Sequence, residues 1–124
     1  MTKALRAASQ EVTLVERSRR YLEQYLPDDY GATVVLGAPS DPEVLSSAGV
    51  DRAAVICIVN RDDALNVLLA DLLRSRYPSK RILMRLDDPV LTQVYREGGY
   101  EVVSPLDLAI KAFTHSIVAV AEQV

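Results

Sequence analysis

The stretch EVTLVERSRRYLEQYL, residues 11–26, opens the pattern that decides the fold of this chain. Its first six residues are rich in alternating, β-branched types, which is typical of a strand. A polar, helix-favouring segment follows at once. The acid Glu16 ends the strand-like part, so its carboxylate is expected at the tip of a strand.

The same alternation continues along the chain. Further strand-like runs are ATVVLG (32–37), AAVICIV (53–59), RILMRL (81–86) and EVVS (101–104). Helical patterns separate them, at residues 18–26, 41–49, 61–77 and 88–99, and residues 2–9 read as the last turns of another helix. Short apolar strands that alternate with helices predict an α/β domain, with a mostly parallel sheet and helices on both faces.

Capping residues mark the helix starts. Asp41-Pro42 and Asp88-Pro89 each place a carboxylate before a proline suited to the first helical turn. Ser104 has an acid, Asp107, three residues later, as in a capping box. In the helix of residues 61–77, four leucines share one face: Leu65, Leu68, Leu69 and Leu72.

Composition limits the function classes. The 124 residues are 49% hydrophobic and 25% charged, which suits one globular domain spanning residues 1–124. The net charge of −3 gives no basic footprint for nucleic acid. No signal-peptide pattern or apolar run of about 20 residues is present, so we expect no membrane insertion and a cytoplasmic location.

Nucleophilic catalysis has weak support in the sequence. Cys57 lies within an apolar run, where we expect a small core residue, and the sole histidine, His115, lies in a distant C-terminal helix. No set of residues has the pattern of a catalytic group, and the chain is not expected to be an enzyme.

The C-terminal segment 105–124 predicts a helix with more apolar surface than one sheet requires. Its apolar stripe repeats at spacings of 4-3-4-3-4, through Leu106, Ile110, Phe113, Ile117, Val120 and Val124. We therefore expect this helix to pack on a second chain in a homodimer. Complete burial in its own domain is the alternative.

Three segments together resemble a known family. EVTLVER (11–17), residues 32–74, and RILMRLDDP with GGYEVVSP (81–89 and 98–105) are similar to the TrkA-N domain, also called the regulator-of-K+-conductance (RCK) domain. The most specific part is G-x-x-S-D-P-E-x-L-x-x-A-G at residues 37–49. The resemblance implies a Rossmann-like domain that binds NAD(H) or an adenine nucleotide. It also implies regulation of a membrane potassium channel or transporter, with the domain at the membrane only through that partner.

The resemblance also implies site residues. Glu16 matches the acid that receives ribose hydroxyls, with Arg17 beside it near the adenine or a phosphate, or else a solvated surface arginine. Gly37 matches the family glycine after the third Rossmann strand, whereas Ala38 replaces the usual aspartate and loses one adenine contact.

The remaining matches follow later strands. Asn60 stands where a small hydroxyl residue is usual and can cap the next helix, and Asn66 keeps the family position on that helix. Arg85 matches an arginine that faces ligand phosphate or a neighbouring subunit, and an ion pair with Asp87 or Asp88 is the equal alternative.

The family's first strand and its glycine-rich loop have no counterpart before Glu16. We therefore expect the first strand to be absent and nucleotide binding to be weak or lost. The two sides of the gap would pair directly, receive a strand from a partner chain, or separate and dimerise. A late start of this sequence, with the loop upstream or in a separate polypeptide, is a further alternative.

The leading interpretation is a regulatory domain of potassium transport that acts by dimer assembly. The alternative is a fragment of a split dinucleotide-binding oxidoreductase, which would need an acid or base near a nicotinamide. A phosphate-accepting receiver domain is disfavoured, because Gly37-Ala38 and Arg85-Leu86 stand near the positions of its acceptor aspartate and lysine.

Overall fold

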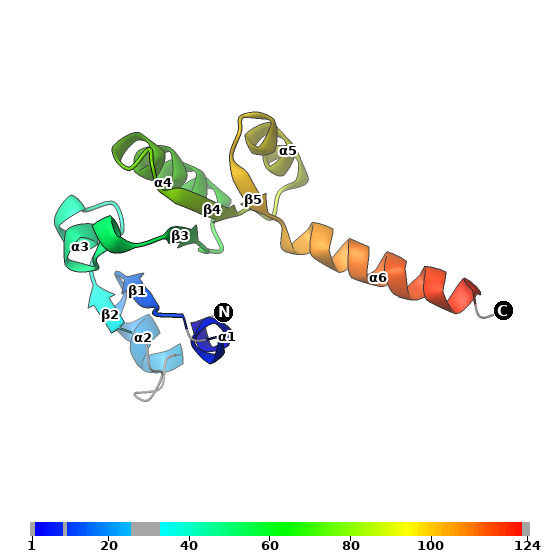
Figure 1. Ribbon diagram of the computed structural model, residues 1–124, viewed down its shortest axis with the longest axis horizontal. Coiled ribbons are helices and arrows are strands. Elements are labelled where there is room, and N and C mark those ends of the chain that lie inside the picture. Colours follow the sequence, from blue (N-terminus) through cyan, green and yellow to red (C-terminus); the bar gives the residue numbers. More distant parts are fainter. Residues whose placement is uncertain (1, 9, 26–32, 123–124) are drawn as a thin grey trace. The chain divides into compact units, whose positions relative to one another are not determined.

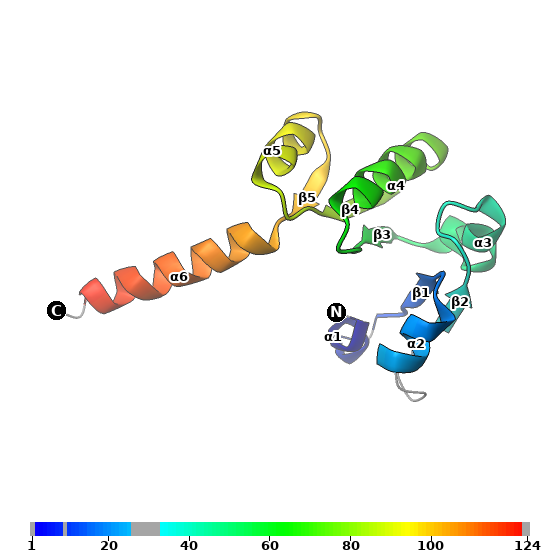
Figure 2. The same ribbon diagram turned by 180° about the vertical axis from the view of Figure 1, so that it is seen from behind.

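The computed structural model describes residues 2–8, 10–25 and 33–122. The chain divides into two compact units, residues 1–53 and residues 54–124. Both contain parallel strands joined by helices, and Figures 1 and 2 show their elements from opposite sides. The α/β class predicted from the sequence is confirmed.

The first unit contains a two-stranded parallel sheet. Its elements are α1 (Thr2–Ala7), β1 (Thr13–Glu16), α2 (Arg19–Tyr25), β2 (Thr33–Leu36), α3 (Pro42–Ser47) and the 3-10 turn η1 (Val50–Arg52). The pairing runs from Thr13 beside Thr33 to Glu16 beside Leu36, so the carboxyl ends of β1 and β2 are level. Among the described residues of this unit, the buried apolar side chains are Leu45 and Val50.

The second unit contains a three-stranded parallel sheet in the order β3-β4-β5. Its elements are β3 (Val55–Ile58), α4 (Asp63–Arg76), β4 (Arg81–Arg85), α5 (Pro89–Glu97), β5 (Glu101–Val103) and α6 (Pro105–Glu122). No strand of the described ranges pairs with the outer edge of β3 or precedes β1. The two sheets are thus separate in their hydrogen bonding within this chain, so β1 and β3 do not pair directly.

The two faces of the second sheet differ in burial because successive side chains of a strand alternate between faces. Ile58, Met84 and Val102 lie side by side in register and are all buried. Cys57 lies on the opposite face and is exposed. The prediction that Cys57 is a core residue is therefore wrong, since the core of this unit forms on the other side of the sheet.

The predicted helix caps are present. The Asp41 carboxylate accepts a hydrogen bond from the Glu43 amide at 2.9 Å, and that of Asp88 accepts from the amides of Val90 and Leu91. Each carboxylate satisfies amide groups that the first helical turn leaves without a partner.

The buried side of α4 is centred on Leu69 and Leu73, each 3% exposed. Leu68 is 64% exposed, although it belongs to the predicted leucine face. The face of α4 that packs on the sheet is therefore not centred on the four predicted leucines. It includes the polar Asn66, whose side chain is 0% exposed.

The base of α6 is fixed to its own unit. Ser104 Oγ accepts a hydrogen bond from the Asp107 amide at 3.1 Å, as predicted for a capping residue. Arg96, on α5, pairs with the Asp107 carboxylate at 2.8 Å and donates to the Val102 carbonyl at 3.0 Å. These contacts hold the first turn of α6 against α5 and β5.

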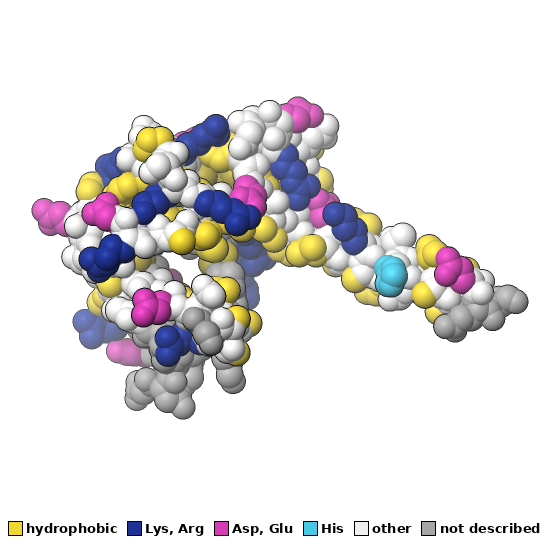
Figure 3. All heavy atoms as spheres, in the orientation of Figure 1, with side chains coloured by type: hydrophobic (Ala, Val, Ile, Leu, Met, Phe, Trp, Pro, Cys, Tyr) yellow, Lys and Arg dark blue, Asp and Glu magenta, His cyan; other side chains and the backbone are white. Residues whose placement is uncertain are grey.

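No described residue of α6 is buried. Its apolar side chains line the helix in Figure 3, and the exposed fractions along the predicted stripe run from 46% at Leu106 to 72% at Phe113. Val124 lies outside the described residues. Across the described ranges, no helix is long and apolar enough to span a membrane.

Candidate functional site

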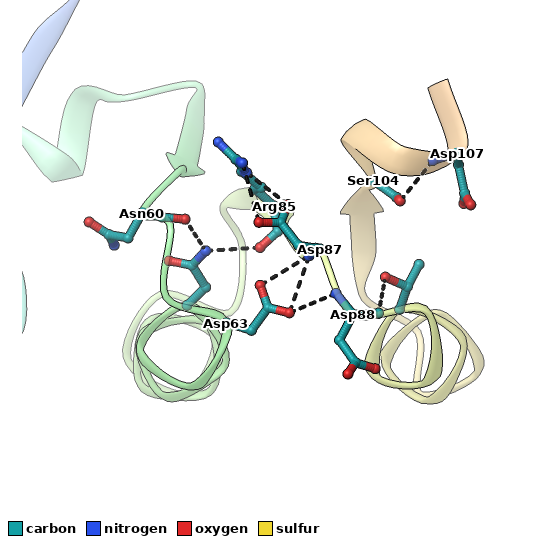
Figure 4. A network of polar contacts seen from close by, with 9 residues as sticks. Asn60, Asp63, Arg85, Asp87, Asp88, Ser104 and Asp107 are labelled. Atoms are coloured by element: carbon teal, nitrogen blue, oxygen red, sulfur yellow. Dashed lines mark hydrogen bonds and ion pairs between the residues drawn. The ribbon is translucent and has the colours of Figure 1, made fainter. Parts of the chain in front are cut away.

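In the second unit, polar contacts gather where β3 and β4 end, and Asn66 is at their centre. Its Nδ2 group donates to the carbonyl of Asn60 at 2.7 Å and to that of Arg85 at 2.9 Å. Figure 4 labels Asn60 and Arg85, the two residues whose carbonyl groups accept these bonds. Asn66 therefore holds two strand ends at a fixed spacing, and its own Oδ1 is buried without a partner among the described residues.

Asp63, the first residue of α4, connects this helix to the segment after β4. Its carboxylate accepts hydrogen bonds from the amide of Asp87 at 3.0 Å and from that of Asp88 at 2.8 Å. Asp63 is not among the site residues predicted from the sequence. An acid in the first turn of a helix that follows a parallel strand is the signal that would have found it.

Arg85 forms a two-bonded ion pair with Asp87, with Nε to Oδ1 at 3.1 Å and Nη2 to Oδ2 at 3.3 Å. One of the two expectations for this arginine, an ion pair with a following aspartate, is therefore present. Both side chains stay partly exposed.

The cap of α4 differs from the expectation. Asp62 is the N-cap, and its Oδ1 accepts from the Leu65 amide at 3.2 Å. The prediction that Asn60 caps this helix is wrong, because Asn60 lies two residues before the cap position. Asn60 contributes its backbone carbonyl to Asn66 instead.

In the first unit, the candidate site lies at the carboxyl ends of β1 and β2. Glu16 is half-buried, and its Oε1 accepts a hydrogen bond from the Ser18 amide at 3.0 Å. The Gly37 amide donates to the Glu16 carbonyl at 3.0 Å. Glu16 and Gly37 thus lie side by side at the ends of β1 and β2, while the adjacent Arg17 is exposed.

Gly37 allows α3 to approach the end of β2. A Cβ atom built on Gly37 would lie 2.5 Å from Cγ2 of Val44, well inside contact distance. We expect Gly37→Ala to lower the free energy of unfolding of the first unit by about 1–3 kcal/mol, because overpacking forces Val44 or the backbone to move. Urea denaturation followed by circular dichroism measures the change.

The matched control is Gly98→Ala. Gly98 has a φ of −76°, and the nearest atom to its added Cβ is the Tyr95 carbonyl oxygen at 3.4 Å. The free energy of unfolding of this variant should stay within about 0.5 kcal/mol of the value for the parent. Equal effects of both glycine substitutions would contradict the close approach at Gly37.

A surface cavity of about 220 Å³ lies at the other end of the second sheet, where β4 and β5 begin. Its cationic side chains are engaged: Arg81 forms a bidentate pair with Glu101, and the Arg74 guanidinium lies 4.4 Å from the ring centre of Tyr100. The cavity is separate from the polar network at the carboxyl ends, where open parallel sheets usually bind ligands.

Metal binding has no visible support in the described part of the chain, where no group of three or more His, Cys, Asp or Glu side chains could hold an ion. His115 lies on the exposed α6 helix.

Known proteins resemble this chain in family and in fold. No curated protein matches the sequence. Among solved structures, the NAD(P)-binding domain of an exopolyphosphatase-related protein from Archaeoglobus fulgidus is similar, with 25% identity and a TM-score of 0.77. That match covers 95% of this chain and 87% of the other. The Kef CTD of Shewanella denitrificans in its AMP-bound form has the same fold at 18% identity and a TM-score of 0.70, over 95% of this chain and 71% of that one.

The family comparison covers most of the sequence. The model of the TrkA-N domain matches residues 1–105, which include both sheets and the helices between their strands. The resemblance seen in the sequence is thereby confirmed. This chain belongs to the TrkA-N domain family.

Proposed function

We propose that this chain is a regulatory, nucleotide-binding-type domain of a potassium transport system and that it acts through dimer assembly. Its partner is a membrane potassium channel or transporter subunit. Membership of the TrkA-N family supports the proposal, as does the likeness to a Kef CTD that was solved with AMP. The observation that carries the assembly part is α6, whose apolar side is uncovered along its described length.

The proposed ligand is NAD(H) or an adenine nucleotide. The half-buried Glu16 carboxylate stands at the tip of β1, with one oxygen fixed by the Ser18 amide, and this placement suits acceptance of hydrogen bonds from a ribose. Arg17, Asn60 and Arg85 are the proposed polar contacts, and Asn66 fixes the strand ends that carry two of them.

The phosphate side of such a site is incomplete in the described residues. A pyrophosphate is usually held by a glycine-rich turn and the amide groups of the following helix. No glycine precedes Glu16 in the sequence. The 124-residue chain should therefore bind these nucleotides weakly or not at all.

Calorimetric titration of the 124-residue chain with NADH, AMP and ATP tests the ligand part. We expect dissociation constants weaker than about 100 µM. Any measurable binding should fall further in Glu16→Ala and stay unchanged in Glu23→Ala, an exposed position on α2. A sub-micromolar constant for the parent chain would show that degenerate binding is the wrong interpretation.

Light scattering at micromolar concentration tests the assembly part. The parent chain should have the mass of a dimer, and Phe113→Asp should have the mass of a monomer because a charge cannot be desolvated cheaply in an apolar interface. His115→Asp, on the polar side of the same helix, should remain a dimer. A parent chain that is monomeric would contradict the proposal.

Potassium regulation is tested in cells. Removing the gene should change growth at limiting potassium, and the Phe113→Asp variant should reproduce that change while the His115→Asp variant complements it. If the monomeric variant complements fully, dimer assembly is not part of the function.

A further inference from the structure

We propose that the surface cavity at the amino-terminal ends of β4 and β5 binds a small phosphate-bearing anion. The cavity lies at the opposite end of the second sheet from the proposed nucleotide contacts Asn60 and Arg85, and binding there does not depend on them. Its cationic side chains come from the last turn of α4, the segment that leads into β4, and the first residue of β4.

The charge around this cavity differs from that of the whole chain. The segment RSRYPSKR, residues 74–81, has four cations and no acid, although the net charge of the chain is −3. Three of these cations line the cavity, Arg74, Lys80 and Arg81, together with the single acid Glu101. The charged side chains of the lining therefore have a net charge of +2, which favours an anion.

The position of a cation near a helix end explains only part of this charge. Arg74 lies in the last turn of α4, where the helix dipole favours positive side chains. Arg81, however, begins β4, and Glu101 begins β5. Charged side chains from three separate elements thus converge on one cavity.

The Arg74 guanidinium is held in place without a ligand. Its Nη1 group donates to the Gly98 carbonyl at 3.4 Å, and its Cζ atom lies 4.4 Å from the ring centre of Tyr100. The Tyr100 ring is itself fixed, because its hydroxyl group donates to Asp71 and the ring meets that of Tyr95 edge to face. A guanidinium that is already oriented loses less conformational entropy when a ligand binds.

Gly99 leaves one side of the same guanidinium uncovered. Its φ is 87°, in the left-handed region that favours glycine. A Cβ atom built on Gly99 would lie 3.6 Å from Nη2 of Arg74. The absence of a side chain at this turn therefore keeps the cavity open next to Arg74.

Arg81 keeps hydrogen-bond donors for a ligand although it is paired with Glu101. A guanidinium has several N–H groups in a fixed plane. The two bonds to Glu101 come from Nε at 3.0 Å and from Nη2 at 2.6 Å, and the Arg81 side chain is 62% exposed. The Nη1 group can therefore donate to an anion, while the pair with Glu101 fixes its direction.

Size and donor type define the ligand class. The cavity volume of about 220 Å³ is below the range of about 300–1,000 Å³ that is usual for drug-sized ligands. Two guanidinium groups offer planar sets of N–H donors that suit the oxygen atoms of a phosphate. The lining charge of +2 favours a doubly charged phosphate over a monovalent carboxylate. Inorganic phosphate or a small phosphate monoester is therefore the expected ligand class.

Titration of the isotope-labelled chain with inorganic phosphate, followed through the NMR signals of the backbone amides, tests the site. Sodium chloride keeps the ionic strength constant, and acetate is the comparison anion. Phosphate should shift the amides of residues 80–82 and 99–101, and acetate should bind there about tenfold more weakly. The inference is overturned by shifts confined to residues 16–18 or 60–66, or by no saturable shift up to about 20 mM phosphate.

Matched variants connect the signal to the cavity. Arg74→Gln and Arg81→Gln should each weaken phosphate binding about tenfold, because each removes charge-assisted hydrogen bonds. Lys111→Gln removes the same charge at an exposed position of α6 and should leave binding unchanged. Glu16→Ala should also bind phosphate like the parent, which separates this site from the proposed nucleotide site. Equal weakening by Arg74→Gln, Arg81→Gln and Lys111→Gln would show a response to net charge alone and overturn the inference.

Glu101→Gln provides a test that partial unfolding cannot imitate. It removes the acid from the lining and releases the donors of Arg81, so phosphate binding should become about threefold tighter or more. Unchanged or weaker binding in this variant, with a circular dichroism spectrum like that of the parent, would contradict an anion site at this cavity.

Vesicles distinguish a soluble phosphate from a lipid headgroup as the source of the phosphate group. The chain should stay in the supernatant when phosphatidylcholine vesicles that contain phosphatidic acid are sedimented, because the expected ligand is soluble. Sedimentation with these vesicles that is lost in Arg74→Gln and Arg81→Gln would overturn the soluble source and assign the same site to a lipid headgroup.

Discussion

Asn66→Asp should destabilise the second unit by about 3–5 kcal/mol at neutral pH, the usual effect of leaving a buried charge unpaired. Asn66 is 0% exposed, and its Nδ2 group faces the carbonyl oxygens of Asn60 and Arg85. A carboxylate at that place can donate to neither carbonyl and would repel both. Denaturant unfolding followed by circular dichroism measures the loss.

Two comparisons separate the charge from the lost hydrogen bonds. Asn66→Ala removes the same donors without adding a charge and should cost about 2–3 kcal/mol. The loss of unfolding free energy in Asn66→Asp, relative to the parent, should become smaller on acidification. The protonated acid is neutral and has one O–H donor. Ser75→Ala, at an exposed position of the same helix, should change stability by less than about 0.5 kcal/mol. An Asn66→Asp variant as stable as the parent at neutral pH would contradict the central role of Asn66.

The second large effect is expected for Leu69→Ala, which should lower the free energy of unfolding by about 2–5 kcal/mol. Leu69 is 3% exposed, in the layer between α4 and the sheet, so its truncation removes buried apolar surface and leaves a cavity. Leu68→Ala is the matched control. It removes the same atoms from the neighbouring residue, whose side chain is 64% exposed. Its effect should stay within about 0.5 kcal/mol. Comparable losses in both variants would mean that the buried side of α4 has been assigned wrongly.

Local sequence signals predicted the fold well. The caps at Asp41, Asp88 and Ser104 depend on residues within three positions of each other, and all three form the expected hydrogen bonds. The order of strands and helices was likewise readable, because short apolar runs and helical periodicity alternate along the chain.

Features that depend on which side of an element is covered were harder to predict. The exposure of Cys57 follows from a sheet with its core on the opposite face, and an apolar run reads alike for either face. The exposure of Leu68 has the same cause, since a small rotation of α4 decides whether Leu68 or Asn66 faces the sheet.

The candidate site was only partly predictable. Resemblance placed Glu16, Gly37, Asn60 and Arg85 at or just after strand ends and Asn66 on the following helix, and the structure has them at those places. Their bonding partners were not readable, because the contact of Asp63 with the amides of Asp87 and Asp88 joins residues far apart in sequence. The nucleotide contacts assigned to these residues stay a prediction.

The fixed base of α6 has a mechanical consequence. A helix of 18 residues is about 27 Å long at a rise of 1.5 Å per residue. Since the Arg96–Asp107 pair and the Ser104 cap join its first turn to α5 and β5, we expect α6 to move as one body about Asp107. A tilt of about 5° at β5 would carry the far end of the helix through roughly 2 Å, given that length. A small movement at the strand ends would thus become a larger displacement at the far end of the helix.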